Sequence, residues 1–165
     1  MSLSDPSAPP GNPDVRYQQD ATAFVGIMGD MASDLILDYS VESIQRLDQF
    51  ITENFAPPAT NVGESLIHGI GCYVGEVIIR HLGGRWDQDG KPQIHGIGCV
   101  EAILPLEKAA RRFQVGPQES LNWYYHTLAK HAYEGRQTPA GIQQQSHSQD
   151  NGGGLMGMFK GLFGK

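Results

Sequence analysis

A histidine and a cysteine lie four residues apart at two places in this chain of 165 residues. Residues 68–72 and residues 95–99 both read His-Gly-Ile-Gly-Cys. Side chains four residues apart lie on one face of a helix, so a His–Cys pair at this spacing can bind one metal ion. Imidazole and thiolate are the ligands of tetrahedral zinc. The repeated word therefore predicts one zinc-type site with four ligands: His68, Cys72, His95 and Cys99.

Close packing or a disulfide could also account for the repeated word. The chain lacks the Cys-x-x-Cys spacing of common zinc sites. Close packing is the simpler role and the one that we prefer: the small residues of each word let neighbouring elements approach, and the histidines lie at the ends of elements. A disulfide between Cys72 and Cys99 is less expected, because the N-terminal segment lacks the basic and apolar regions of a signal peptide. The metal and the disulfide both require the two words to lie side by side.

Polar side chains continue the row of the first word along a predicted helix. Glu64, His68 and Glu76 share one face at this spacing and could act as an acid–base set. The same pattern is typical of a solvated helix surface. The sequence contains no motif of a serine hydrolase elbow, a phosphate loop, a dinucleotide site or a zinc protease. We therefore expect a non-enzymatic protein, and a metal-binding protein or metal-dependent enzyme is the alternative.

The C-terminal segment, residues 155–165, carries the second candidate site. It follows a predicted flexible linker at 136–154 that is rich in Gln, Ser and Gly. Its large apolar side chains gather on one side of a helical wheel, which predicts an amphipathic docking peptide for a groove on a protein partner. A membrane surface and a groove on the same domain are the alternatives. The predicted contact residues are Leu155, Met156, Met158, Phe159, Leu162 and Phe163.

Composition and charge limit the class of protein. The net charge of −6 argues against binding to nucleic acid, which requires a basic surface. Residues 1–13 are rich in Pro and Ser and are predicted to be disordered, whereas 14–135 has the size of one domain. The sequence has no run of about 18 apolar residues, so we expect no membrane-spanning helix. We expect a cytoplasmic protein, with peripheral membrane attachment and a homodimer left open.

The elements that must position these residues follow from spacing and from helix-end signals. Apolar residues at helical spacing predict a first helix with Asp14 as its N-cap, and a clearer one over 41–55 with Ser40 as its N-cap. In the second helix we expect Asp48 to face outward. Further helices are expected over 61–82, 106–113 and 117–133. Gly71 and Gly75 predict close approach of another backbone to the third helix.

A small antiparallel sheet completes the expected fold. Asp89-Gly90 predicts the turn of a hairpin over 85–97, and residues 99–104 are expected to form a third strand. Helices with a small segregated sheet indicate a helix-rich α+β fold in a single domain.

Several short motifs within residues 35–128 resemble a bacterial domain family of unknown function. They are Gly-Glu-Val-Ile at 75–78, Leu-Gly-Gly-Arg-Trp at 82–86, Pro-Leu-Glu-Lys at 105–108, and Glu-Ser-Leu at 119–121 followed by two tyrosines. These motifs mark turns and packing positions, so the resemblance implies the order of elements and no activity.

Overall fold

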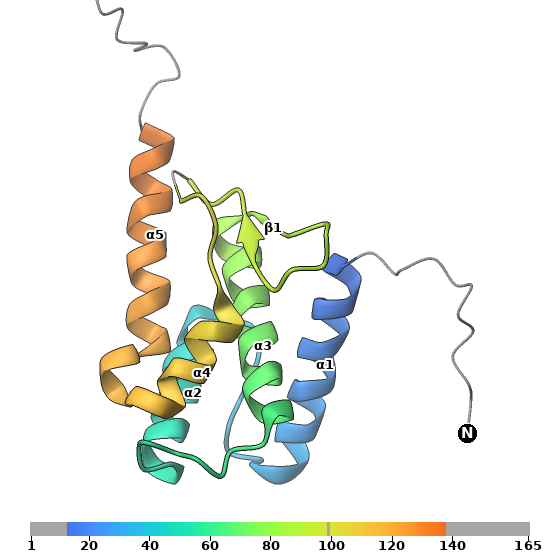
Figure 1. Ribbon diagram of the computed structural model, residues 1–165, viewed down its shortest axis with the longest axis vertical. Helices are drawn as coiled ribbons and strands as arrows, with labels where there is room; N and C mark the ends of the chain where they lie inside the picture. The colour runs from blue at the N-terminus through green and yellow to red at the C-terminus, as the bar shows by residue number, and fades with distance from the viewer. Residues whose placement is uncertain (1–12, 99, 138–165) are drawn as a thin grey trace, which may run out of the picture.

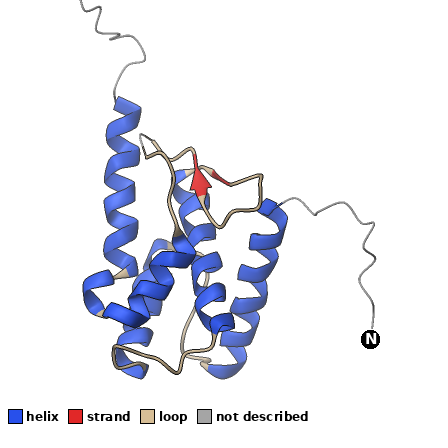
Figure 2. Ribbon diagram, in the orientation of Figure 1, coloured by secondary structure: helices blue, strands red, loops and turns tan. Residues whose placement is uncertain are grey.

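The computed structural model describes residues 13–98 and 100–137, and the side chains of all of these except Pro13 and Gln137. These residues form a helical bundle with a small hairpin at one end (Figures 1 and 2). The helix-rich α+β fold is confirmed. The helices are α1 Pro13–Met31, α2 Val41–Asn54, α3 Glu64–Leu82, α4 Pro105–Val115 and α5 Leu121–Gln137, with a 3-10 turn at Pro117–Glu119. The strands are β1 Arg85–Trp86 and β2 Ile94–His95.

Helix α3 forms the centre of the bundle, and its middle, from Gly69 to Ile78, is buried. Its glycines let other elements approach closely, as their spacing predicts. A Cβ atom at Gly71 would lie 2.6 Å from the Cα atom of Leu106 in α4, and one at Gly75 would overlap the ring of Trp86. Gly69 receives the ring of Phe24 from α1 in the same way. Helix α3 is therefore enclosed by α1, α4 and the hairpin.

The hairpin is shorter than its sequence predicts. Only Arg85 with His95 and Trp86 with Ile94 pair as strand residues. The expected strand over 99–104 is present only as isolated bridges, in which Ile94 pairs with Ile103 and Ile97 pairs with Val100. Gly96 and Gly98 have positive φ angles of 85° and 53°, so the backbone turns there and cannot continue as an extended strand.

Local signals mark most helix ends correctly. The Ser40 side chain accepts a hydrogen bond from the Ser43 backbone N–H at 3.2 Å, which confirms the predicted N-cap of α2. Helices α3 and α4 end at Gly83 and Gly116, both with positive φ. Helices α3 and α5 begin a few residues later than the sequence predicts. For α5 the reason is that the Pro117–Glu119 segment forms a 3-10 turn of its own.

Asp48 is buried, and its predicted outward orientation is wrong. The guanidinium of Arg112 in α4 donates to one of its carboxylate oxygens at 2.5 Å, and the hydroxyl of Ser120 donates to the other at 2.5 Å. Helix α2 packs against α5 along this side. A buried charge requires such partners, so Asp48 joins α2 to α4 and to the start of α5.

Helix α1 buries only part of its apolar side chains. Its buried side chains are Tyr17, Ala21, Phe24 and Met28. Ile27 and Met31, two large apolar residues of the same helix, are 56% and 77% exposed. The Phe24 ring packs on Gly69 of α3, so this face of α1 lies against α3. An apolar strip of α1 is left at the surface.

Candidate functional site

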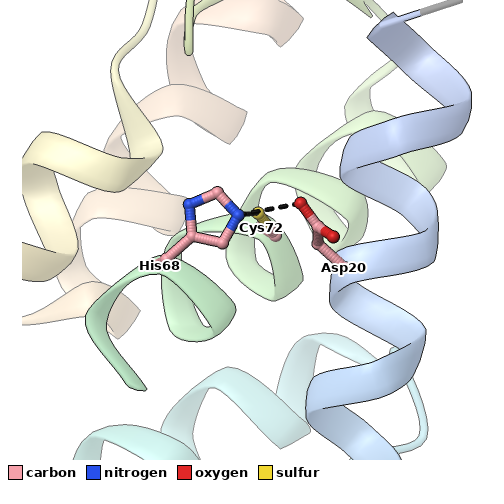
Figure 3. A group of neighbouring side chains, drawn as sticks. All are labelled: Asp20, His68 and Cys72. Atoms are coloured by element: carbon pink, nitrogen blue, oxygen red, sulfur yellow. Dashed lines mark hydrogen bonds and ion pairs between the residues drawn. The ribbon is translucent and has the colours of Figure 1, made fainter. Parts of the chain in front are cut away.

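The strongest cluster of reactive side chains joins α1 to α3. Figure 3 shows Asp20 of α1 and His68 of α3 pointing toward one another, with Cys72 one helical turn beyond His68. His68 Nε2 lies 2.8 Å from Asp20 Oδ2 and 3.4 Å from Cys72 Sγ. The three candidate ligand atoms all lie within 4.8 Å of one another. In the part of the chain that the structure describes, no other three His, Cys, Asp or Glu residues cluster so closely.

The three side chains differ in exposure, and Cys72 is the most buried of them. Asp20 and His68 are 36% and 38% exposed, whereas Cys72 is fully buried as a free thiol. Burial, followed by the nearby carboxylates of Asp20 and Glu76, raises the pKa of Cys72 to about 12, and Arg16 lowers it by less. Without another cation, Cys72 is therefore a neutral thiol at pH 7.

This arrangement does not match a cysteine–histidine–aspartate catalytic triad. In a triad the acid and the nucleophile contact opposite nitrogens of the imidazole, so that the ring passes a proton between them. Here Asp20 and Cys72 both contact Nε2 of His68. A buried thiol with a raised pKa is also a poor nucleophile. Three donor atoms that converge on one point suit a shared cation better than a proton relay.

The second His-Gly-Ile-Gly-Cys word has a different environment. His95 Nε2 lies 3.0 Å from Asp87 Oδ2, and its Nδ1 lies 2.9 Å from the Glu101 carbonyl oxygen. These contacts tie the hairpin to the following loop. The structure brings together His68 and Cys72 of the four predicted ligands and does not place His95 in their group. Cys99, the fourth, lies outside the described residues.

Asp20 is the member of the cluster that sequence reasoning missed. It lies 48 residues before His68 and belongs to no motif. Only the packing of α1 on α3 brings it there, and the spacing within either helix holds no signal of that pairing. Predicting this contact would have required knowing which face of α1 packs against which face of α3.

The predicted acid–base set is divided among separate environments. Glu64 is exposed at the start of α3. Glu76 is buried and accepts a hydrogen bond from Trp86 Nε1 at 2.9 Å. Burial raises the pKa of Glu76, although the Trp86 bond and Arg80 lower it in part. Glu76 therefore fixes Trp86 in the core, while His68 pairs with Asp20.

An apolar pocket of about 460 Å³ lies beside the cluster. It is formed by α1, the end of α2 and the start of α3. Its polar side chains are Asp20, His68 and Ser65, so two members of the cluster form part of its wall. The remaining lining is mostly large and apolar and includes Phe24, Ile27, Met31, Phe50, Phe55 and Leu66.

The predicted docking peptide, residues 155–165, lies outside the described residues.

Comparisons with known protein families, with curated proteins and with solved structures find no match to this chain. The resemblance to a bacterial family of unknown function stays a prediction. Within residues 13–98 and 100–137, no helix combines the length and the hydropathy that crossing a bilayer requires.

Proposed function

We propose that the protein is a non-enzymatic binding and adaptor domain of the cytoplasm, and that its apolar pocket holds the C-terminal peptide, residues 155–165. The pocket is the observation that carries the proposal. Its volume of about 460 Å³ is within the usual range of ligand sites, and Ile27 and Met31 at its edge are more than half exposed. An amphipathic helix fits an apolar groove of this kind through a few large anchors.

The chemistry of the peptide complements the pocket. The peptide supplies Leu, Met and Phe anchors on one side of a helix, and Lys160 lies on the opposite side. The pocket supplies a mostly apolar lining that includes Phe24, Ile27 and Met31. Methionine and phenylalanine side chains on both surfaces adapt to one another at low cost.

The chain between the domain and the peptide is long enough for this contact. Residues 138–154 separate the end of α5 from Leu155. At about 3.3 Å for each residue, a linker of this length reaches up to about 55 Å. A typical flexible chain of the same length has an end-to-end distance of about 23 Å. The end of α5 lies at the opposite end of the bundle from the end of α1 and the start of α3, which contribute to the pocket (Figure 1). The peptide therefore reaches the pocket of its own chain with a linker near its extended length, or it reaches the pocket of a neighbouring copy.

The test uses the full-length chain with methyl groups labelled for NMR. In the variant Phe159→Ser/Phe163→Ser we expect the methyl signals of Ile27, Met28 and Met31 to shift, because the anchors leave the pocket. A synthetic peptide of residues 152–165 should restore the wild-type shifts. The matched control, Lys160→Ser, changes the opposite side of the peptide and should leave these signals nearly unchanged.

A second pair of variants tests the pocket side of the contact. Ile27→Asp places a charge in the pocket and should reduce peptide binding, whereas Ile36→Asp, at an exposed position outside the pocket, should not. Dependence of the wild-type shifts on protein concentration would assign the contact to neighbouring copies. Identical spectra of the wild type and the double Phe variant would contradict the proposal. Shifts produced only by lipid vesicles would favour the membrane alternative.

A further inference from the structure

We propose that Asp20, His68 and Cys72 form a binding site for a divalent transition metal ion of the zinc class. The site joins α1 to α3 and differs in its ligands from the four-ligand site that the repeated word predicts. The proposal rests on the convergence of three side chains and is independent of the occupant of the pocket.

The two donor distances that involve His68 fit such an ion with little movement, and the third pair, Asp20 and Cys72, lies within 4.8 Å. Bonds of about 2.0–2.1 Å to nitrogen or oxygen and about 2.3 Å to sulfur place tetrahedral ligand atoms about 3.3–3.6 Å apart. The observed separation of His68 Nε2 and Cys72 Sγ is 3.4 Å. The separation of His68 Nε2 and Asp20 Oδ2 is 2.8 Å. An ion would open this second distance by about half an ångström, within the reach of one side-chain rotation.

The donor set selects the class of metal. A thiolate with an imidazole favours zinc and similar ions over magnesium and calcium, which prefer oxygen ligands. A carboxylate and a thiolate together balance the two charges of the ion. Binding is a ligand exchange without oxidation or reduction. The three donor atoms each give a lone pair in place of bound water, and the Cys72 thiol gives its proton to the solvent.

The surroundings define the open side of the site. Cys72 is fully buried, whereas Asp20 and His68 line the pocket. A fourth ligand, either water or a donor atom of a molecule in the pocket, would therefore enter from that side. Glu76 and Arg16 are the charged neighbours that act on Cys72, with opposite sign. The added cation compensates for the two carboxylates around the buried sulfur.

Cobalt titration of the full-length protein tests the site directly. Co²⁺ bound by a thiolate gives a sulfur-to-metal charge-transfer absorption, and tetrahedral coordination intensifies its visible bands. We expect one equivalent to saturate both signals and Zn²⁺ to displace the Co²⁺. Cys72→Ser should abolish the charge-transfer band. His68→Gln and Asp20→Asn should lower the affinity at least about 10-fold, since changes to outer-shell residues alone cost about 10- to 100-fold.

His95→Gln and Cys99→Ser are the matched controls, because they change the same residue types in the second word. Both should leave stoichiometry and spectrum unchanged. Loss of the cobalt spectrum in either control would overturn the three-residue site in favour of the four-ligand one. No charge-transfer band in the wild type would overturn both. Asp20→Asn changes a partly exposed side chain without changing its shape, so a folded variant is available even if His68→Gln does not fold.

Discussion

Glu76 is a carboxylic acid in the core of the bundle, and its environment favours the neutral form. Burial raises its pKa above the ordinary value of 4.5, and the Trp86 hydrogen bond and the Arg80 charge only reduce this effect. The folded protein therefore holds the proton more tightly than the unfolded chain does. The corresponding stabilisation is complete below the unfolded pKa and is lost as the pH rises through the folded pKa.

Glu76→Gln tests this sign. Glutamine keeps the oxygen that accepts from Trp86 Nε1 and removes the titration, so the variant should gain stability relative to the wild type as the pH rises from 4 to 7. Urea unfolding at several pH values measures the difference. A difference that stays constant with pH, or one that falls, would contradict the buried-acid interpretation.

Trp86→Phe removes the donor instead and should lower the free energy of unfolding by about 1–3 kcal/mol, because the Glu76 side chain then lacks that hydrogen bond.

At the scale of elements, two glycines in helices should respond oppositely to the same substitution. Gly29→Ala in α1 meets nothing within 4 Å, so it should stabilise the protein by about 0.5–1 kcal/mol through helix propensity. Gly71→Ala in α3 meets the backbone of Leu106 and should destabilise it by about 1–3 kcal/mol despite the same gain in propensity. Thermal unfolding of both variants checks the pair. Equal shifts of the melting temperature would exclude close helix packing as the role of Gly71.

The element boundaries are predictable where one residue determines them locally. Ser40 caps α2 through its own hydroxyl, and Gly83 and Gly116 end helices by adopting positive φ. The wrong orientation predicted for Asp48 has a different cause, because a distant segment determines it. Asp48 is polar, and only the arrival of Arg112 from 64 residues away makes its burial favourable.

The candidate site shows the same division. His68 and Cys72 are identifiable because their spacing is local and helical. The repeated word predicts His95 and Cys99 as the two further metal ligands, since identical words suggest identical roles. Asp20 takes that place because α1 packs on α3, and His95 instead pairs with Asp87 inside its own hairpin. Sequence similarity between the two words therefore does not indicate a shared environment.

On the scale of the whole molecule, α1 packs mainly along one side among the residues that the structure describes. It lies at the edge of the bundle (Figure 1) and packs mainly against α3 and β1. Its start is held by the Trp86 backbone N–H, which donates to Asp14, and by the Tyr17 hydroxyl, which donates to the Gly90 carbonyl. Helices with few partners open most readily in the native state. We expect α1 to exchange its amide hydrogens faster than α3.

Zinc should change this order if it bridges the two helices. At a concentration 100 times the dissociation constant, a ligand that binds only the folded state adds about 2.7 kcal/mol to the free energy of unfolding. Hydrogen exchange followed by mass spectrometry should therefore show α1 protected by Zn²⁺ in the wild type. Cys72→Ser should show no such protection. Zinc-induced protection of the hairpin rather than of α1 would argue against the bridge.

The two tryptophans lie in opposite surroundings, and this gives the molecule an internal optical probe. Trp86 is 1% exposed and is stacked on Tyr17 of α1 at a centroid distance of 4.2 Å, whereas Trp123 on α5 is 64% exposed. A Trp123→Phe variant should retain only the blue-shifted emission of the shielded indole, which acrylamide quenches poorly. Because that indole is stacked on Tyr17 of α1, its fluorescence should change when α1 detaches from the bundle. The opening of this helix could therefore be followed in real time without an added label.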